Sequence, residues 1–299
     1  MQTINHYYNT SGKHILSLFG VTFLACIAYI LLDNYSLKNS AALFVGIPVF
    51  MASALAIKTH SRHLTRNILM GLSLGLLASF IFLNEGSFCV PMTAPLFLLS
   101  GLVVSFSTKK FRQSEHRNWL ALAPVFALSL LAIEGTSPYF TTDRLTHIEV
   151  TQNTNLSPAE IKENLSQNRQ FTNIPLLLSW GFPQPVSVSG SGIQAGDIRD
   201  IYFSGGEGEP GHTLFKVTER TENSVKFELL KDESHIGHWL QWKSSEVSWQ
   251  TDHSGKTRIT WNIEYDRQLS PSWYFSPIQK LAVSLAAEAL IQNMILNPL

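Results

Sequence analysis

Long apolar segments without Lys, Arg, Asp or Glu fill most of the first 133 residues. A helix needs about 20 residues to cross the hydrocarbon core of a bilayer, and four segments reach or approach that length. They are His14–Leu32, Ser40–Ile57, Asn67–Leu83 and Val90–Phe106. A fifth segment, Trp119–Ile133, has only 15 residues, so it could span with its flanks or instead be buried or re-entrant. We expect a membrane region over residues 1–135 with about five transmembrane helices.

The loop charges predict how this region is oriented. Basic residues gather in segments 58–66 and 107–118, and the other connecting loops contribute only Lys38 as a basic residue. Because basic loops stay in the cytoplasm, the N-terminus is expected there and the fifth helix runs outward. We therefore expect an integral protein of the inner or plasma membrane with its second half outside the cytoplasm. If the fifth segment does not cross, the second half remains cytoplasmic.

Two alternatives for the apolar segments are disfavoured. The first segment is long for the apolar core of a secretory signal, and residues 31–34, Leu-Leu-Asp-Asn, offer no small-residue cleavage site. A transporter or pump usually needs an ionisable group inside the bundle, and none of the five segments carries a Lys, Arg, Asp or Glu.

The charge changes sign between the two halves. Residues 1–139 hold nine basic and four acidic side chains, whereas residues 140–299 hold thirteen and eighteen. The negative second half argues against a nucleic-acid partner. Both cysteines, Cys26 and Cys89, lie in the apolar half, so thiol catalysis and cysteine-ligated zinc are excluded from the polar half. We expect no cofactor and no metal.

The polar half begins after a short linker, residues 136–145, and has the pattern of an α+β domain over residues 146–299. Thr146–Gln152 alternates like a strand. Ser157-Pro-Ala-Glu160 is a capping box for a helix through about Leu165.

Further along, Ile174–Trp180 predicts a second short helical or coiled stretch. From Val186 onward the alternation of apolar and polar residues predicts about six antiparallel strands, the clearest being Thr257–Arg267. Ser276-Pro277 predicts the start of a long last helix that ends near Ile295. This helix is the only element long enough to cover the apolar face of the sheet, with either a packed core or a cavity between them.

Three stretches carry a resemblance to a known superfamily. They are Gly196-Asp-Ile-Arg-Asp-Ile-Tyr-Phe-Ser-Gly205, Thr257-Arg-Ile-Thr-Trp-Asn-Ile-Glu-Tyr265 and Pro271-Ser-Trp-Tyr-Phe-Ser-Pro277. Together with the element order, they resemble the SRPBCC superfamily, which includes START-type lipid carriers, birch-allergen-like proteins and the polyketide cyclase/dehydrase group. The resemblance covers about residues 145–297. It implies a helix-grip fold with a cavity for a hydrophobic ligand, and it implies no shared catalytic residues. We recognise no family resemblance in the membrane half.

The inward aromatic residues are the candidates for lining such a cavity. They are Phe203, Phe215, Phe227, Trp249, Trp261 and Tyr265. For Trp249 and Trp261, simple core filling is the default interpretation. Arg199 has the same strand parity as Phe203, so it could point inward and anchor a carboxylate or phosphate through a bidentate contact. The alternative for Arg199 is an ion pair with Asp197 or Glu219.

Other motifs predict no chemistry. His235-x-x-His238 has the spacing of neither a helical nor a strand metal pair, so we interpret it as a solvated loop. The glycine-rich segment 204–211 lacks the Lys-Ser/Thr ending of a phosphate loop. Glu264 and Asp266 fall on the polar face of their strand.

The sequence therefore favours membrane-anchored binding of a hydrophobic or amphipathic, lipid-like molecule. The partners would be the lipid bilayer and that small molecule. One alternative is a cyclase- or dehydrase-type enzyme, which needs an acid or base inside the same cavity. Another is a structural or signalling protein with a packed domain. Enzyme activity is the less favoured interpretation, and no catalytic residue is predicted.

Overall fold

The computed structural model describes residues 20–296, apart from residues 59–62, 83–88, 115–117, 173, 177, 179–181 and 206–208. The chain divides into two compact units. The helical unit comprises Met1–Thr142 and Leu269–Ser272, and the grip unit comprises Asp143–Gln268 and Trp273–Leu299. No pattern in the sequence predicted that Leu269–Ser272 would belong to the helical unit. There the backbone N–H of Ser270 donates to the carbonyl of Asn39 at 2.8 Å.

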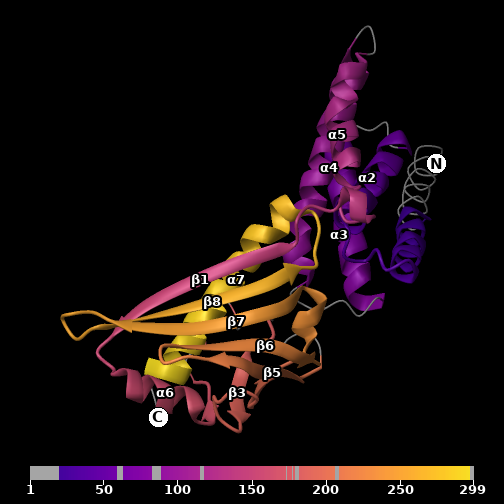
Figure 1. The fold of residues 1–299 in the computed structure, drawn as a ribbon. Helices are drawn as coiled ribbons and strands as arrows, with labels where there is room; N and C mark the ends of the chain where they lie inside the picture. The colour runs from indigo at the N-terminus through magenta and orange to yellow at the C-terminus, as the bar shows by residue number, and fades with distance from the viewer. Residues whose placement is uncertain are drawn as a thin grey trace. The chain divides into compact units, whose positions relative to one another are not determined.

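Helices build the first unit (Figure 1). In chain order they are Gly20–Asn34, η1 (Ala42–Gly46, a π-helix), α2 (Ile47–Lys58), α3 (Leu64–Phe82), α4 (Cys89–Gln113), η2 (Trp119–Leu122, a 3₁₀-helix) and α5 (Ala123–Leu131). A short 3₁₀ turn, η3 (Pro138–Phe140), follows. Each predicted apolar segment therefore overlaps with a helix of the structure. Residues 14–19 and Leu83 of the predicted spans lie outside the described residues.

Among the described residues, one helix is both long and apolar enough to cross a membrane, namely Val90–Gln113. The helices that match the other predicted spans are apolar but shorter. α4 continues past its predicted end at Phe106 and includes Lys110 and Arg112 in its last turn. Basic side chains at this position interact favourably with the negative end of the helix dipole. The helix therefore includes Lys110 and Arg112, which the sequence pattern places in a connecting loop.

Small residues let the helices of this unit approach closely. A Cβ placed on Gly101 of α4 would come within 2.4 Å of Leu72 Cδ1 on α3, so the Leu72 side chain would have to shift to make room for it. The hydroxyls of Thr65 and Ser105 form a hydrogen bond of 2.6 Å across the unit. Met51 and Ile68 are fully buried between the helices.

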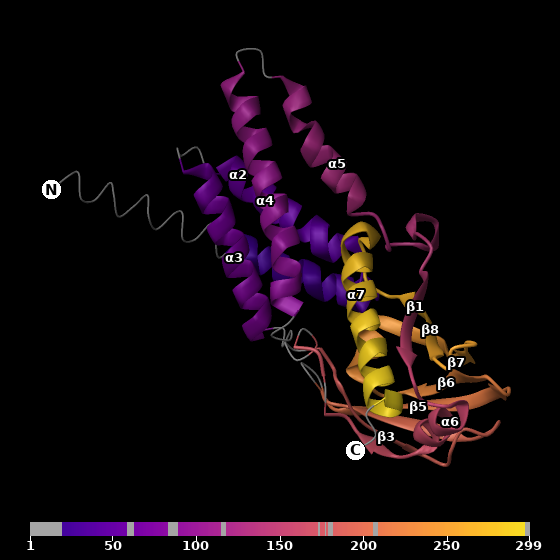
Figure 2. The ribbon, with the colours of Figure 1, turned by 90° about the vertical axis from the view of Figure 1, so that its left-hand side faces the viewer.

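The grip unit is built on one antiparallel sheet of eight strands, in the order β1-β8-β7-β6-β5-β4-β3-β2. The strands are β1 (Leu145–Thr154), β2 (Arg169–Gln170), β3 (Pro185–Gly190), β4 (Ile198–Phe203), β5 (Gly211–Arg220), β6 (Ser224–Asp232), β7 (Leu240–Thr251) and β8 (Thr257–Arg267). The sheet curves around the long helix α7 (Ser272–Ile291), as Figures 1 and 2 show. This is the expected helix-grip arrangement.

The local signals of the polar half explain most of these elements. The capping box is confirmed, because Ser157 Oγ accepts from the Glu160 N–H and the Glu160 carboxylate accepts from the Ser157 N–H, at the start of α6 (Pro158–Ser166). The alternation of β8 is also confirmed: Ile259, Trp261 and Ile263 are buried, while the residues between them are more exposed. Residues 177, 179 and 180 lie outside the described residues, so the short helical or coiled stretch predicted over Ile174–Trp180 is not tested as a whole.

The predicted start of the last helix is wrong. α7 begins at Ser272, four residues before the predicted cap Ser276, so Pro277 lies inside the helix. Pro277 is the sixth residue of α7, beyond the four N–H groups that lack intrahelical partners, so it removes the one hydrogen bond that its position would donate to the preceding turn. At its other end α7 passes into a π-helical turn, η6 (Gln292–Leu296).

Candidate functional site

A cavity lies in the grip unit between the sheet and the end of α7. Its lining is Val188, Arg199, Ile201, Phe203, Phe215, Phe227, Trp242, Ser245, Trp261, Ile263, Leu290 and Met294. The cavity has a volume of about 50 Å³. Ligand sites usually have about 300–1,000 Å³, so this is a narrow, mostly apolar space that a ligand must widen.

The predicted site residues divide into two groups. Arg199, Phe203, Phe215, Phe227 and Trp261 line the cavity. Trp249 and Tyr265 do not, although both are buried in the core of the grip unit.

Trp242 is a lining residue that the sequence pattern missed. Strict alternation from Val247 and Trp249 would place Lys243, and not Trp242, on the inner face. The register between β7 and β8 shifts between Trp242 and Ser244, and a bulge of this kind re-aims the side chains on one side of it. Lys243 Nζ consequently pairs with Asp266 at 2.8 Å, and Trp242 reaches the cavity.

Arg199 is buried, as its parity predicted, but its contacts differ from both predicted alternatives. Its side chain is 2% exposed. Nη1 donates to the carbonyl of Ser166 at 3.0 Å and Nη2 to the carbonyl of Gln167 at 2.7 Å, so the guanidinium caps the C-terminal end of α6. Neither Asp197 nor Glu219 forms an ion pair with it within the described residues. Its Nε–H is buried without a hydrogen-bond partner.

The surroundings of Arg199 disfavour its charge. Burial lowers the pKa of Arg199, and the charge of Asp197 offsets part of that effect. The carboxylate of Asp197 is engaged in the β3–β4 turn, where it accepts from Gln194 N–H at 2.7 Å and from the Ser191 hydroxyl at 3.2 Å. The cation inside the cavity wall is therefore held by neutral carbonyls and not by a contact anion.

Gly190 holds β3 against this arginine. It pairs with Arg199 in the ladder, and its φ of +148° lies in a region that side chains rarely adopt. A Cβ at this position would lie 2.2 Å from the carbonyl oxygen of Ile198 and 3.2 Å from Arg199 Cδ. Glycine is thus required for the close approach of the two strands beside the cavity.

Two more polar groups belong to the lining. Trp261 Nε1 donates to Ser245 Oγ at 2.6 Å, so the Ser245 hydroxyl has its own proton left to donate. Trp242 Nε1 is buried and has no hydrogen-bond partner. Phe215 links this region to Arg199, because it pairs with Arg199 between β4 and β5 and its ring centroid lies 6.5 Å from that of Trp242.

The acidic and histidine candidates lie outside the cavity. Glu264 contacts His147 at 3.2 Å, and Asp200 contacts His212 at 2.9 Å. Residues His235–His238 form a 3₁₀ turn, η5, and no metal-binding cluster of three or more His, Cys, Asp or Glu occurs in the described parts of the chain. Among the described lining residues, Arg199 is the one ionisable side chain.

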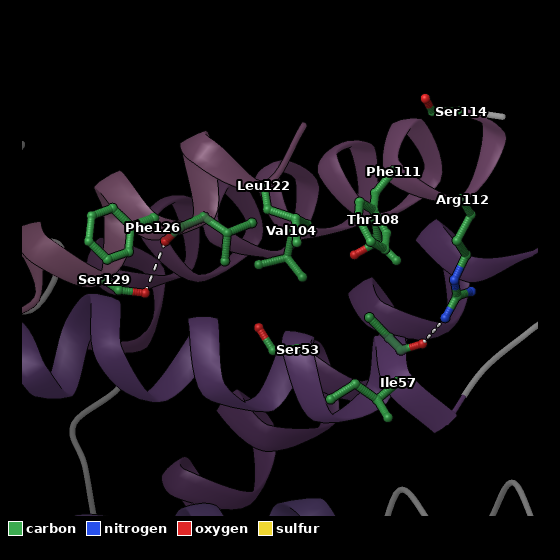
Figure 3. Close-up of a pocket in the computed structure, with 12 residues that line it drawn as sticks. Ser53, Ile57, Val104, Thr108, Phe111, Arg112, Ser114, Leu122, Phe126 and Ser129 are labelled. Carbon is green, nitrogen blue, oxygen red and sulfur yellow. Dashed lines mark hydrogen bonds between the residues drawn. The ribbon is translucent and has the colours of Figure 1, made fainter. Parts of the chain in front are cut away.

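A second hollow lies in the helical unit, between α2, α4 and α5 (Figure 3). It is wider, about 810 Å³, and its walls carry apolar side chains such as Val104 and Phe126 together with several hydroxyls. Figure 3 shows Arg112 and Ser129 toward opposite ends of it. Arg112 Nη2 donates to the carbonyl of Ala56 near the end of α2 at 2.6 Å.

Comparison with known proteins yields only distant structural matches. No protein-family model matches the sequence. No curated protein matches it either. Truncated norcoclaurine synthase from Thalictrum flavum overlaps 53% of this chain and 98% of its own, with 13% identity and a TM-score of 0.35. Protein Ms6760 from Mycobacterium smegmatis overlaps 49% and 86%, with 16% identity and a TM-score of 0.32.

Ginseng major latex-like protein 151 from Panax ginseng overlaps 49% of this chain and 99% of its own, with 12% identity and a TM-score of 0.30. At such TM-scores the overlaps carry no argument about function. The description of the grip unit therefore rests on its own strands, register and helix.

Proposed function

We propose that the chain is an integral membrane protein whose helical unit anchors a helix-grip domain, and that this domain binds a hydrophobic or amphipathic small molecule between its sheet and α7. The observation that carries the proposal is the cavity itself, which is apolar except for a few polar groups. Apolar walls with a few fixed polar groups are typical of sites for small hydrophobic ligands.

The surface of the helical unit supports anchoring in a bilayer. Large apolar side chains stand exposed on several of its helices, with Ile57 75%, Phe106 61% and Phe126 66% exposed. Extensive apolar surface is unfavourable in water and favourable against lipid.

The charges of the helical unit support several crossings with one orientation. The Arg112 contact brings the end of α4 to the end of α2, and the Thr65–Ser105 bond places the start of α3 near the last turns of α4. Lys58 and Arg66 thus belong to the same end of the unit as Arg112. A basic end is expected on the cytoplasmic side, and a crossing fifth segment would then put the grip unit on the other side.

The size of the cavity requires adjustment on binding. Leu290 of α7 and Met294 of η6 form its helical wall. Met294 is suited to yield, because methionine is unbranched and flexible, and π-helical turns such as η6 occur frequently at functional sites. We expect a ligand to displace these two side chains while the sheet stays in place.

Native mass spectrometry of the full chain in lipid nanodiscs, followed by extraction and identification of bound molecules, tests the proposal. Ile201 lines the cavity, so Ile201→Phe should fill the space and lower ligand occupancy several-fold. Leu230→Phe is the matched control, because Leu230 lies on β6 with 54% of its surface exposed and outside the lining. A chain that carries no ligand, or equal occupancy in the two variants, would contradict binding in this cavity.

A further inference from the structure

Among the described residues that line the cavity, the polar groups without a hydrogen-bond partner are all hydrogen-bond donors. Arg199 Nε and Trp242 Nε1 are both buried and unpaired, and the Ser245 hydroxyl still has a proton to donate. The unpaired buried side-chain acceptors of the described chain, such as those of Asp232 and Gln279, belong to residues outside the lining. A molecule that fits this space must bring hydrogen-bond acceptors.

The positive charge in the cavity wall indicates which charged group the ligand carries. Arg199 places one positive charge in the wall, and each of its two terminal nitrogens already donates one hydrogen bond, to the carbonyls of Ser166 and Gln167. A buried charge without a contact counter-ion is costly, and a single negative charge would neutralise it. A carboxylate brings one charge and about four lone-pair positions on two oxygens, whereas a phosphate monoester would add a second, uncompensated charge.

From these observations we infer that the ligand is an apolar monocarboxylic acid, with its carboxylate held by Arg199 Nε and Trp242 Nε1 and its apolar body against Phe203, Phe215 and Phe227. Phe215 neighbours both donor residues, because it pairs with Arg199 in the sheet and its ring packs edge-on against that of Trp242. The contact to Arg199 is a single charge-assisted hydrogen bond and not the bidentate clamp expected from the sequence. This inference rests on the proposed function, since it names the ligand class of the same cavity.

The experiment uses the full chain in phosphatidylcholine nanodiscs and a decanoic acid that carries a photoreactive diazirine on its chain. After irradiation, labelled peptides are mapped by mass spectrometry. Unlabelled decanoate, decanol and decylamine then compete at equal mole fraction in the lipid. Peptides from β4, β7 and α7 should be labelled, and decanoate should compete about tenfold better than decanol, since a hydrogen bond to a charged group contributes about 1.5–3 kcal/mol and each 1.4 kcal/mol is a factor of ten.

Two tryptophan variants form a matched pair. Trp242→Phe removes an unpaired buried N–H from a residue that lines the cavity and should reduce the preference for decanoate over decanol about threefold to tenfold. Trp249→Phe removes an equally unpaired N–H from a residue outside the lining and should leave that preference unchanged. Arg199→Met should abolish the preference, and because Arg199 also caps α6, its melting temperature is measured alongside.

The outcomes separate this inference from the proposed function. If the cavity peptides are labelled but decanoate and decanol compete equally, the cavity binds hydrophobic molecules as proposed, and the inference that the ligand is a carboxylic acid is wrong. An unchanged preference in Trp242→Phe would likewise overturn the assigned donor pair. No labelling of these peptides by the diazirine acid would overturn the acid as ligand class, and the proposed binding function then stands or falls by the native mass spectrometry of the full chain.

Discussion

Replacing Tyr265 with phenylalanine tests whether this residue belongs to the core or to the ligand site. The side chain is 0% exposed, and its hydroxyl has no hydrogen-bond partner. The Thr146 hydroxyl interacts with it weakly, enough to hold its pKa down slightly, but no hydrogen bond of regular geometry joins them. Because burying an unsatisfied hydroxyl costs about 1–3 kcal/mol, we expect Tyr265→Phe to raise the free energy of unfolding by about 1 kcal/mol at neutral pH.

The same substitution changes how stability depends on pH. Burial raises the pKa of Tyr265 from 10.0 to about 12, against smaller opposing effects of Thr146 and Arg267. Above pH 10 the unfolded chain loses this proton while the folded chain keeps it, so stability falls as the pH rises. The slope is about 1.4 kcal/mol per pH unit, or about 3 kcal/mol in total between pH 10 and 12. Phenylalanine has no proton to lose, so this contribution disappears in the variant.

Thermal unfolding of the full chain, followed by tryptophan fluorescence from pH 7 to 12, measures both effects. A gain of 1 kcal/mol corresponds to about 2–4 °C for a unit of this size. Tyr139→Phe is the control, since Tyr139 is 94% exposed and its replacement should change stability little. Loss of stability at neutral pH, or an unchanged slope above pH 10, would refute the reasoning. A loss of ligand binding with unaltered stability would place Tyr265 in the ligand site after all.

Three shorter predictions follow from other parts of the chain. Gly190→Ala should destabilise the grip unit by more than about 3 kcal/mol, because the strain at positive φ and the overlap with backbone atoms add together. Gly196→Ala is the control: its φ is +96° but no atom lies within 4 Å of the added Cβ, so it introduces strain alone and should cost about 1–2 kcal/mol. Chemical denaturation measures the free energy of unfolding of both variants. Thr65→Val removes the hydrogen bond to Ser105 and should lower the stability of the helical unit by about 0.6 kcal/mol, measured in a steric-trap or denaturant assay. A loss above about 2 kcal/mol would show that the hydroxyl has a further role. With the native cysteines replaced by serine, Glu209→Cys should react with an impermeant thiol reagent on intact cells, and reaction only after lysis would place the grip unit in the cytoplasm.

Patterns that are local in the sequence predicted the elements of the grip unit well. The Ser157–Glu160 capping box closes on itself within four residues, so its outcome depends little on the rest of the fold. The alternation of β8 is equally robust, because one face meets the core and the other meets solvent along the whole strand. The short strand β2 was missed, since two residues, Arg169 and Gln170, carry no detectable period.

Features that depend on neighbouring strands could not be predicted. The inward position of Trp242 follows from the bulge between β7 and β8, and a bulge changes strand parity without a reliable sequence mark. The start of α7 at Ser272 was missed because Ser276-Pro277 has the residue types of a helix start, and nothing local distinguishes a first-turn proline from one in the second turn. Trp249 was a cavity candidate by parity, with core filling as its default interpretation, and parity says which face a residue occupies but not how far along the strand a cavity extends.

Arg199 shows why burial of a charged residue had to be seen before it could be interpreted. Its parity predicted an inward side chain, but the partners of its guanidinium, the carbonyls at the end of α6, lie more than thirty residues away in sequence. The same side chain therefore caps a helix with two of its nitrogens and also lines the cavity. Any substitution of Arg199 alters both, so a loss of ligand binding in such a variant does not by itself identify an anchor. The comparison of Trp242 with Trp249 avoids this ambiguity, because each change deletes one unpaired N–H from the same sheet and only one of them lines the cavity.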